Sequence, residues 1–565
     1  YVVKSFNDDK PYDRFVQEQI AGDELWPDDL ALDQSFQIPR AKLEHLEARI
    51  ATGLYTLGTQ IHESNMNGRK REYEQLTDWV DTTGSVFLGL TIGCARCHDH
   101  KFDPITQRDY YSFQAIFAAS REEEIPIVSG MEIADFKQHY PRIIAADEAR
   151  RACRLFEQRV KGRPLTPAEQ HQRRQLREAL ADAILAIPEK ATSAPNDPWD
   201  GLMEIPSATV LGHCDPALIP EIRLLNRGEL NRPRELMTPD IPAALRRASN
   251  YSEPLPGPQG NRKALALWLT RPDHPLTARV MVNRLWLWHF GAGLVATPND
   301  FGKMGQPPSH PELLDWLATQ FVRGGWSIKR MHRLIMLSNT YQMASTYQDK
   351  AGSAADPDNR FLWRMNRRRL EAEAYWDALH AVAGTLNLKM GGRPIMPPLA
   401  DEELGAGQRS SWIVPADPSE WTRRGLYILV RRNFVFPMFE IFDSPVNSVS
   451  TARRETTNVA PQALWALNNR HVYSQARQFA ARLVREVGHS PQAWIDRAWE
   501  IALGRRPTAA EVSDARRLLA AFEAHPARPG DDPPPDLAQL PPARAAALTK
   551  LCLAILNLNE FIFID

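Results

Sequence analysis

The chain has 565 residues, of which 43% are hydrophobic and 24% are charged. This length predicts two or three domains, and the composition is that of a globular protein with a large core. The 68 basic residues nearly balance the 69 acidic ones, so net charge gives no reason to expect nucleic acid as a partner. No apolar run approaches the roughly 18 residues of a membrane helix, and we expect no integral membrane span.

The first 58 residues are expected to form helices joined by turns. Residues 11–22 end at a glycine, and residues 41–53 have apolar side chains at helical spacing. The chain begins with Tyr1 rather than methionine. We therefore expect an N-terminally truncated first domain, with any signal peptide, anchor or further domain lying upstream.

A C-x-x-C-H motif is formed by Cys94, Cys97 and His98, and this pattern is typical of covalent haem attachment. Each thiol can add to one vinyl group of the porphyrin, and the following imidazole can be an axial ligand of the iron. With 5 cysteines and 15 histidines in 565 residues, chance would produce this order roughly 0.001 times. The motif therefore predicts one covalent haem c with His98 on the iron.

Other chemistry remains open at this motif. A zinc site would need a second pair of ligands at similar spacing, and none follows in the sequence. A redox dithiol would belong to a βαβ unit, whereas the residues before the motif look helical. On the other side of the haem, His62 and Met66 are weak candidates for the sixth ligand, in a stretch that reads as a solvated loop.

The residues around the motif predict two helices that hold the haem between them. Residues 76–93 are mostly apolar and carry Gly89 and Gly93, which allow close approach to a porphyrin. After the motif, Thr106 and Asp109 have the spacing of a capping box that opens the next helix.

The run from residue 80 to residue 117, VDTTGSVFLGLTIGCARCHDHKFDPITQRDYYSFQAIF, resembles the planctomycete-type cytochrome-c-like domain. Residues 283–302, 307–342 and 453–469 are similar to the planctomycete-specific domain that commonly accompanies it. The resemblance implies an exported haem c protein in the periplasm, at the cell surface or outside the cell. The family's biochemical role is largely unassigned, so the resemblance names no substrate.

The fold class we predict is mainly α, in three parts. Residues 1–124 form a helical cytochrome-c-like haem domain, 125–222 a charged helical hairpin with loops, and 223–565 a larger helical domain with few short strands. In the last part, residues 424–432 read as a strand. The final helix has an apolar stripe in which Cys552 is expected to be a buried, inert thiol.

Polar residues at helix ends and loops of the second domain are expected to converge in a cleft over an apolar scaffold. Our first candidates for binding an anionic or hydroxyl-rich substrate, such as a polysaccharide, are Arg284, His289, Asp300 and Arg454. The competing account is that the same residues form ion pairs that hold helices together.

Two functions of different classes follow from these patterns. The first is electron transfer, in which the haem exchanges electrons with a partner protein or with oxidation or reduction of a substrate in the second domain. The second is a non-redox carbohydrate-binding or hydrolytic protein in which the C-x-x-C-H motif holds a structural metal. Because no known catalytic signature occurs in the chain, whether it is an enzyme is left open.

Overall fold

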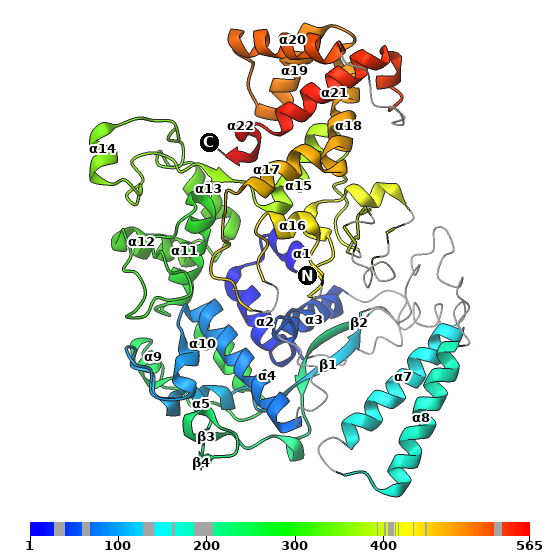
Figure 1. Cartoon of the computed structure of the whole chain (residues 1–565). Coiled ribbons are helices and arrows are strands. Elements are labelled where there is room, and N and C mark those ends of the chain that lie inside the picture. The colour runs from blue at the N-terminus through cyan, green and yellow to red at the C-terminus, as the bar shows by residue number, and fades with distance from the viewer. Residues whose placement is uncertain are drawn as a thin grey trace. The chain divides into compact units, whose positions relative to one another are not determined.

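We describe the fold from a computed structural model of the chain (Figure 1). The structure describes residues 1–27, 40–58, 68–127, 141–160, 164–185, 207–392, 394–400, 403–404, 412, 414–415, 417–432, 434–446, 449–524 and 534–564. His62 and Met66 lie outside the described residues.

The chain divides into two compact units. Unit 1 comprises Tyr1–Ser338 and Ser448–Ala452, and unit 2 comprises Asn339–Asn447 and Arg453–Asp565. The sequence-based division at residues 124 and 222 remains a prediction, because one compact unit can contain more than one sequence family. The chain leaves unit 1 after Ser338 and returns to it briefly more than a hundred residues later.

Helices make up most of unit 1. They are α1 (Val2–Asn7), α2 (Tyr12–Leu25), α3 (Arg40–Ala51), α4 (Gly68–Thr83), α5 (Gln107–Ala115), α7 (Pro141–Arg159), α8 (Pro167–Leu185), α9 (Ala243–Ala248), α10 (Asn261–Leu269), α11 (Thr277–Phe290), α12 (Pro311–Arg323) and α13 (Ile328–Met336). Short 3-10 or π turns lie between them, namely η1 (Thr52–Thr56), η2 (Gly84–Leu88), η3 (Ile92–Arg96), η4 (Pro216–Leu218) and η5 (Asn226–Gly228).

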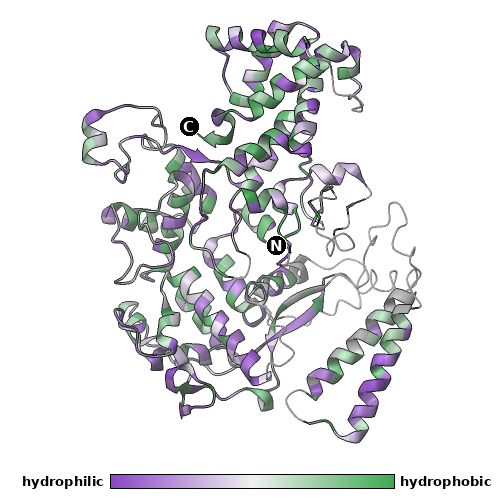
Figure 2. Ribbon diagram, viewed as in Figure 1, coloured by the Kyte–Doolittle hydropathy of each residue, from purple (hydrophilic) through white to green (hydrophobic). Residues whose placement is uncertain are grey.

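Two small antiparallel sheets complete unit 1. Strand β1 (Ser120–Pro126) pairs with β2 (Ser207–His213), and β3 (Arg223–Leu225) pairs with β4 (Pro233–Leu236). Between β1 and β2 the chain forms the expected helical hairpin of α7 and α8, which lie side by side in Figure 1 and are hydrophilic over much of their length in Figure 2.

A buried ion pair joins α2 to α10. The Arg262 side chain is 1% exposed, and its guanidinium donates hydrogen bonds of 2.8 and 2.6 Å to the two carboxylate oxygens of Asp23. The Arg262 Nε atom lies 3.3 Å from Glu24, and Nη1 donates to the carbonyl of Ile20. The pair of charges is therefore satisfied inside the unit rather than by solvent.

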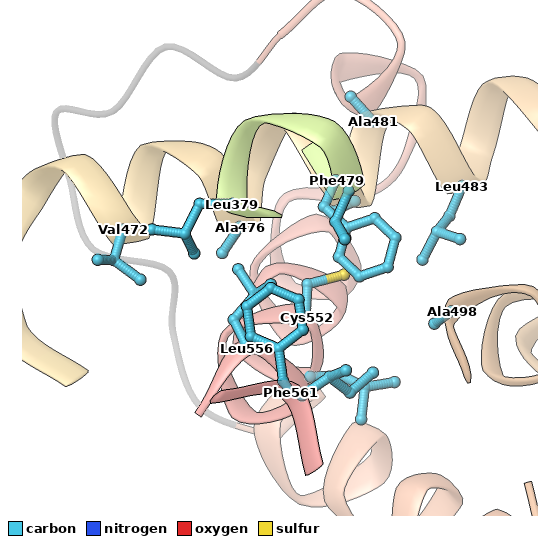
Figure 3. Close-up of a cluster of buried hydrophobic side chains, with 14 of the residues drawn as sticks. Leu379, Val472, Ala476, Phe479, Ala481, Leu483, Ala498, Cys552, Leu556 and Phe561 are labelled. Carbon is cyan, nitrogen blue, oxygen red and sulfur yellow. The ribbon is translucent and has the colours of Figure 1, made fainter. Parts of the chain in front are cut away.

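Unit 2 is built around a hydrophobic core. Its helices are α14 (Lys350–Ala355), α15 (Ala372–Ala383), α16 (Pro437–Ile441), α17 (Ala460–Asn468), α18 (Arg470–Val487), α19 (Pro491–Leu503), α20 (Ala509–Glu523), α21 (Pro542–Leu556) and α22 (Asn559–Ile562). It also contains η6 (Pro418–Thr422), η7 (Gly425–Tyr427), η8 (Leu537–Gln539) and the strands β5 (Arg368–Arg369) and β6 (Phe563–Ile564), which pair antiparallel. Figure 3 shows Phe479, Leu556 and Phe561 meeting around Cys552.

Two histidines pack beside Trp376 in this core; the side chain of His380 is fully buried and that of His471 is half-buried. The rings of His380 and His471 lie 5.0 Å apart, and the Trp376 ring stacks on His471 at 4.3 Å. His380 Nδ1 is hydrogen-bonded to Thr385 Oγ1 at 2.8 Å, while the Nε2 atoms of both histidines are buried without a hydrogen-bond partner. Both rings are consequently held as neutral imidazoles.

The predicted mainly α fold with few short strands is confirmed. In the described residues the strands form three two-stranded sheets. The prediction of a strand at residues 424–432 is wrong. Residues 425–427 form the turn η7, and the pairing of the described residues there consists of single bridges, Ile395 to Ile428 and Arg431 to Phe434. Among the described residues, no helix has both the length and the apolar character needed to cross a bilayer.

Candidate functional site

The C-x-x-C-H motif begins in a tight turn between two helices of unit 1. Helix α4 continues into the π turn η2, which ends at Gly89 with a φ of 59°. Three residues further on, η3 begins; it carries Cys94, and Cys97 forms its C-terminal cap. Helix α5 then starts after Thr106 with the predicted capping box to Asp109. The expected arrangement of the motif between two helices is therefore present.

All three motif side chains reach the surface. Cys94 and Cys97 are free thiols and both are exposed. His98 is exposed as well, and its Nδ1 donates a 2.7 Å hydrogen bond to the backbone carbonyl of Asp99. This bond fixes the tautomer in which Nε2 carries the free lone pair, the form that a metal-ligating histidine needs.

Arg96, between the two cysteines, ties the turn to α4. Its guanidinium forms hydrogen bonds of 3.0 and 3.3 Å to the carboxylate of Glu74, and its Nε donates to the hydroxyl of Tyr73 at 3.0 Å. The Arg96 carbonyl accepts hydrogen bonds from Gln107 and Tyr111 of α5. The backbone that carries both thiols is thus held from two sides.

The polar residues after the motif stabilise the turn itself. His100 Nδ1 accepts a 2.9 Å hydrogen bond from the backbone N–H of Asp103, and Asp99 accepts one of 2.7 Å from the N–H of Gln107. Asp103 in turn accepts a 2.7 Å bond from the N–H of Lys303, in the loop after α11. Among the described residues, no group of three or more His, Cys, Asp and Glu side chains is arranged to hold a metal ion.

Gly89 and Gly93 allow close approach of neighbouring groups, and in the structure these groups are side chains of the protein. A Cβ atom on Gly89 would lie 2.9 Å from the ring of Phe301, and one on Gly93 would lie 2.8 Å from the carboxylate of Asp81. The apolar residues of the preceding run, among them Phe87 and Ile92, are buried in the core of unit 1.

A pocket of about 880 Å³ lies beside Cys94, within the range of about 300–1,000 Å³ found for ligand sites. One wall is the polar face of α4, another is the Leu90–Cys94 segment, and Glu122 of β1 also contributes. Val449 and Ser450, from the short segment that returns to unit 1, complete the lining. Sequence reasoning missed this pocket, because its walls are separated by more than 300 residues.

Asp81 is a carboxylate of this pocket whose pKa is shifted by its environment. Burial raises its pKa to about 6, the nearby carboxylates of Asp78 and Glu74 add to the rise, and Arg96 opposes it. Its described hydrogen bond is a long one, 3.5 Å from the hydroxyl of Tyr110. A carboxyl that titrates near neutral pH in a pocket is a functional candidate.

The four candidates of the predicted cleft contact other groups of the protein. Arg284 donates to the carbonyls of Ser85 and Val86, in η2, and to Asn299 Oδ1. Next to Asn299, Asp300 accepts a hydrogen bond from the N–H of Gly302.

His289 is on the same helix as Arg284, and its Nε2 atom is hydrogen-bonded to Nδ1 of His332 in α13 at 2.8 Å. Arg454 belongs to unit 2, where it pairs with Glu373 through hydrogen bonds of 2.6 and 3.0 Å. These contacts agree with the account in which such residues hold the fold together, and a shared cleft stays a prediction.

Residues 1–122 match the family PSCyt2, described as a protein of unknown function (DUF1549), and residues 261–519 match PSD1, a protein of unknown function (DUF1553). The chain carries two domains of unknown function. Both are of the planctomycete type that the sequence resembles. The DUF1549 domain contains the C-x-x-C-H motif, and the DUF1553 domain contributes Val449 and Ser450 to the pocket beside it. No curated protein and no solved structure matches the chain.

Proposed function

We propose that the protein is an exported c-type haem protein that takes part in electron transfer. Cys94 and Cys97 would hold the porphyrin through thioether bonds, and His98 would be the axial ligand of the iron. The observation that carries the proposal is the exposure of both free thiols and of the imidazole on one short turn.

The geometry of the turn is suited to this role. The hydrogen bond from His98 Nδ1 to the Asp99 carbonyl orients the ring and leaves Nε2 available. The contacts of Arg96 with Glu74 and Tyr73 limit the movement of the backbone between the two thiols. When bound, the haem would supply a one-electron redox centre whose potential depends on its axial ligands and surroundings.

Location and partner follow from the same proposal. In the family that the sequence resembles, covalent attachment of haem takes place after export, which favours the periplasm or the cell surface. The electrons would pass to a partner protein or serve the oxidation or reduction of a substrate. We propose an open or weakly filled sixth position, since no methionine stands at a convincing distance after the motif.

Covalent haem staining on a denaturing gel tests the proposal directly. The full chain is produced in a host that exports it and ligates haem, and the expected result is a stained band with a Soret absorption. Cys94→Ser and Cys97→Ser should each weaken the stain, whereas the matched control Cys214→Ser, outside the motif, should not. An unstained wild-type protein that contains zinc instead would refute the haem function and favour the structural-metal alternative.

The sixth position is tested by adding carbon monoxide to the reduced protein. An open or weakly filled site gives a spectral change on addition, because the gas binds to the free coordination position. A low-spin spectrum that does not respond to carbon monoxide, but changes in the Met66→Ala variant, would assign Met66 as a tight ligand.

A further inference from the structure

The pocket beside Cys94 has the features of a ligand site of its own. Polar side chains line it at helical spacing, among them Glu74, Asp78, Asp81 and Thr82 of α4 and Ser85 of the π turn η2. A polar helix face normally meets open solvent. Here it borders a pocket of about 880 Å³ that Ile92 and Cys94 also line.

Asp81 has no ion-pair partner in the described part of the chain. The guanidinium that lowers its pKa, that of Arg96, is bound to Glu74. A carboxylate that is largely removed from water and lacks a cation is costly to ionise. A ligand that brings a positive charge to Asp81 would remove this cost.

The pocket lining also determines which charge it accepts. Among the described residues, the titratable and charged groups that surround Asp81 or line the pocket come from η1, α4, η3, α5 and β1, and they are Tyr55, Arg71, Glu74, Asp78, Cys94, Arg96, Tyr110 and Glu122. Carboxylates outnumber guanidinium groups among them, so an anionic ligand would be repelled. Hydroxyl groups on Thr82, Ser85 and Ser450 provide donors and acceptors for a polar ligand.

We propose that this pocket binds a hydroxyl-rich organic cation of the amino sugar class, with Asp81 as the counter-ion of its ammonium group. The carboxylate accepts hydrogen bonds from the ammonium, and the serine and threonine hydroxyls bind the sugar hydroxyls. The site goes beyond the proposed haem function, because Asp81 and the hydroxyl groups of Thr82, Ser85 and Ser450 take no part in attaching the porphyrin. Cys94 lines the same pocket, so a porphyrin on its thiol would border the bound ligand. It is also distinct from the cleft for an anionic or hydroxyl-rich substrate expected from the sequence, because none of the four residues of that cleft lines this pocket.

The outer wall of the site comes from the DUF1553 domain. Val449 and Ser450 line the pocket and are themselves exposed to solvent. Because the rest of the lining belongs to the DUF1549 domain, a complete site requires both families in one chain. Val449→Trp places a large ring at this wall, whereas Val446→Trp changes a similarly exposed valine that does not line the pocket.

Three probes of one shape and different charge test the proposal on the full-length exported protein. Calorimetric titration is expected to show binding of glucosamine with a Kd of about 1 mM or tighter. Glucose, which is neutral, should bind more weakly, and glucuronate, which is anionic, should not bind. Absence of glucosamine binding, equal binding of glucose, or binding of glucuronate would each overturn the proposal.

Variants locate the site within the protein. Asp81→Asn should weaken glucosamine binding about tenfold, whereas the matched control Asp315→Asn, an exposed carboxylate on α12, should not change it. Removing the charge of a desolvated carboxylate does not lower stability, so the Asp81 variant is expected to fold. Val449→Trp should weaken binding and Val446→Trp should not.

The pH dependence gives a second readout that needs no variant. Because the pKa of Asp81 is raised to about 6 by burial, glucosamine binding should tighten as the pH rises from 5 to 7. Binding that is unchanged over this range, or that persists in Asp81→Asn, would assign the ligand to another place. Haem staining of the same preparation reports separately on the proposed haem function, so failure of either idea can be recognised.

Discussion

Replacing Arg284 by methionine is expected to destabilise unit 1 by about 2–4 kcal/mol. The guanidinium donates hydrogen bonds to Ser85 O at 2.9 Å, Val86 O at 2.5 Å and Asn299 Oδ1 at 2.9 Å, which the variant would leave without their donor. A hydrogen bond from a charged donor contributes about 1.5–3 kcal/mol. The total is smaller than the sum, because the desolvation that lowers the pKa of Arg284 is relieved in the variant.

Urea unfolding followed by tryptophan fluorescence measures this effect. The matched control is Arg279→Met on the same helix, where the arginine pairs with a carboxylate that is 58% exposed and a loss of about 0–1 kcal/mol is expected. Since Ser85 and Val86 lie in the turn before the motif, Arg284→Met should also lower haem incorporation. A variant that unfolds like the wild type but loses binding of a substrate would refute this reasoning and restore Arg284 as a substrate residue.

Further predictions concern stability and reactivity away from the motif. Burial lowers the pKa of His380 to about 2 and that of His471 to about 4, so the unfolded chain takes up protons first as the pH falls below about 6.5. The stability of unit 2 should fall by about 3 kcal/mol between pH 7 and pH 4 from His471 alone, and urea unfolding that is flat over this range would contradict it. Arg262→Met should cost unit 1 about 3–5 kcal/mol at pH 7 and less at pH 3, where protonation of Asp23 removes the unpaired charge; calorimetry at both pH values measures this. Cys552, which is fully buried, should resist a thiol reagent in the folded protein and react after unfolding, as mass spectrometry would show.

Local chemistry made several elements predictable from the sequence. The capping box of Thr106 and Asp109 forms as expected, because both partners lie within one helical turn. Helix α11 ends at Gly291, whose φ of 80° suits a residue without a Cβ atom. Cys552 is buried as its position on an apolar stripe indicated.

Features that depend on distant residues were not predictable in the same way. The apolar run at residues 424–432 has the composition of a strand, but the chain turns at residues 425–427. Gly425 packs closely there, since a Cβ atom on it would lie 2.9 Å from the backbone of Glu373. The environment of Asp81 depends on burial and on the neighbouring Arg96 and Tyr110. The polar spacing along α4 signals an exposed face, and only the fold reveals that the face borders a pocket.

The return of residues 449–452 to unit 1 affects the order in which the protein can fold during synthesis. The amino-terminal unit leaves the ribosome first, yet its last wall emerges only after residues 339–447 have been made. Until then the pocket beside Cys94 lacks Val449 and Ser450. A chain cut after Ser338 would lack these pocket residues permanently. The boundaries of the two sequence families do not show that unit 1 needs them.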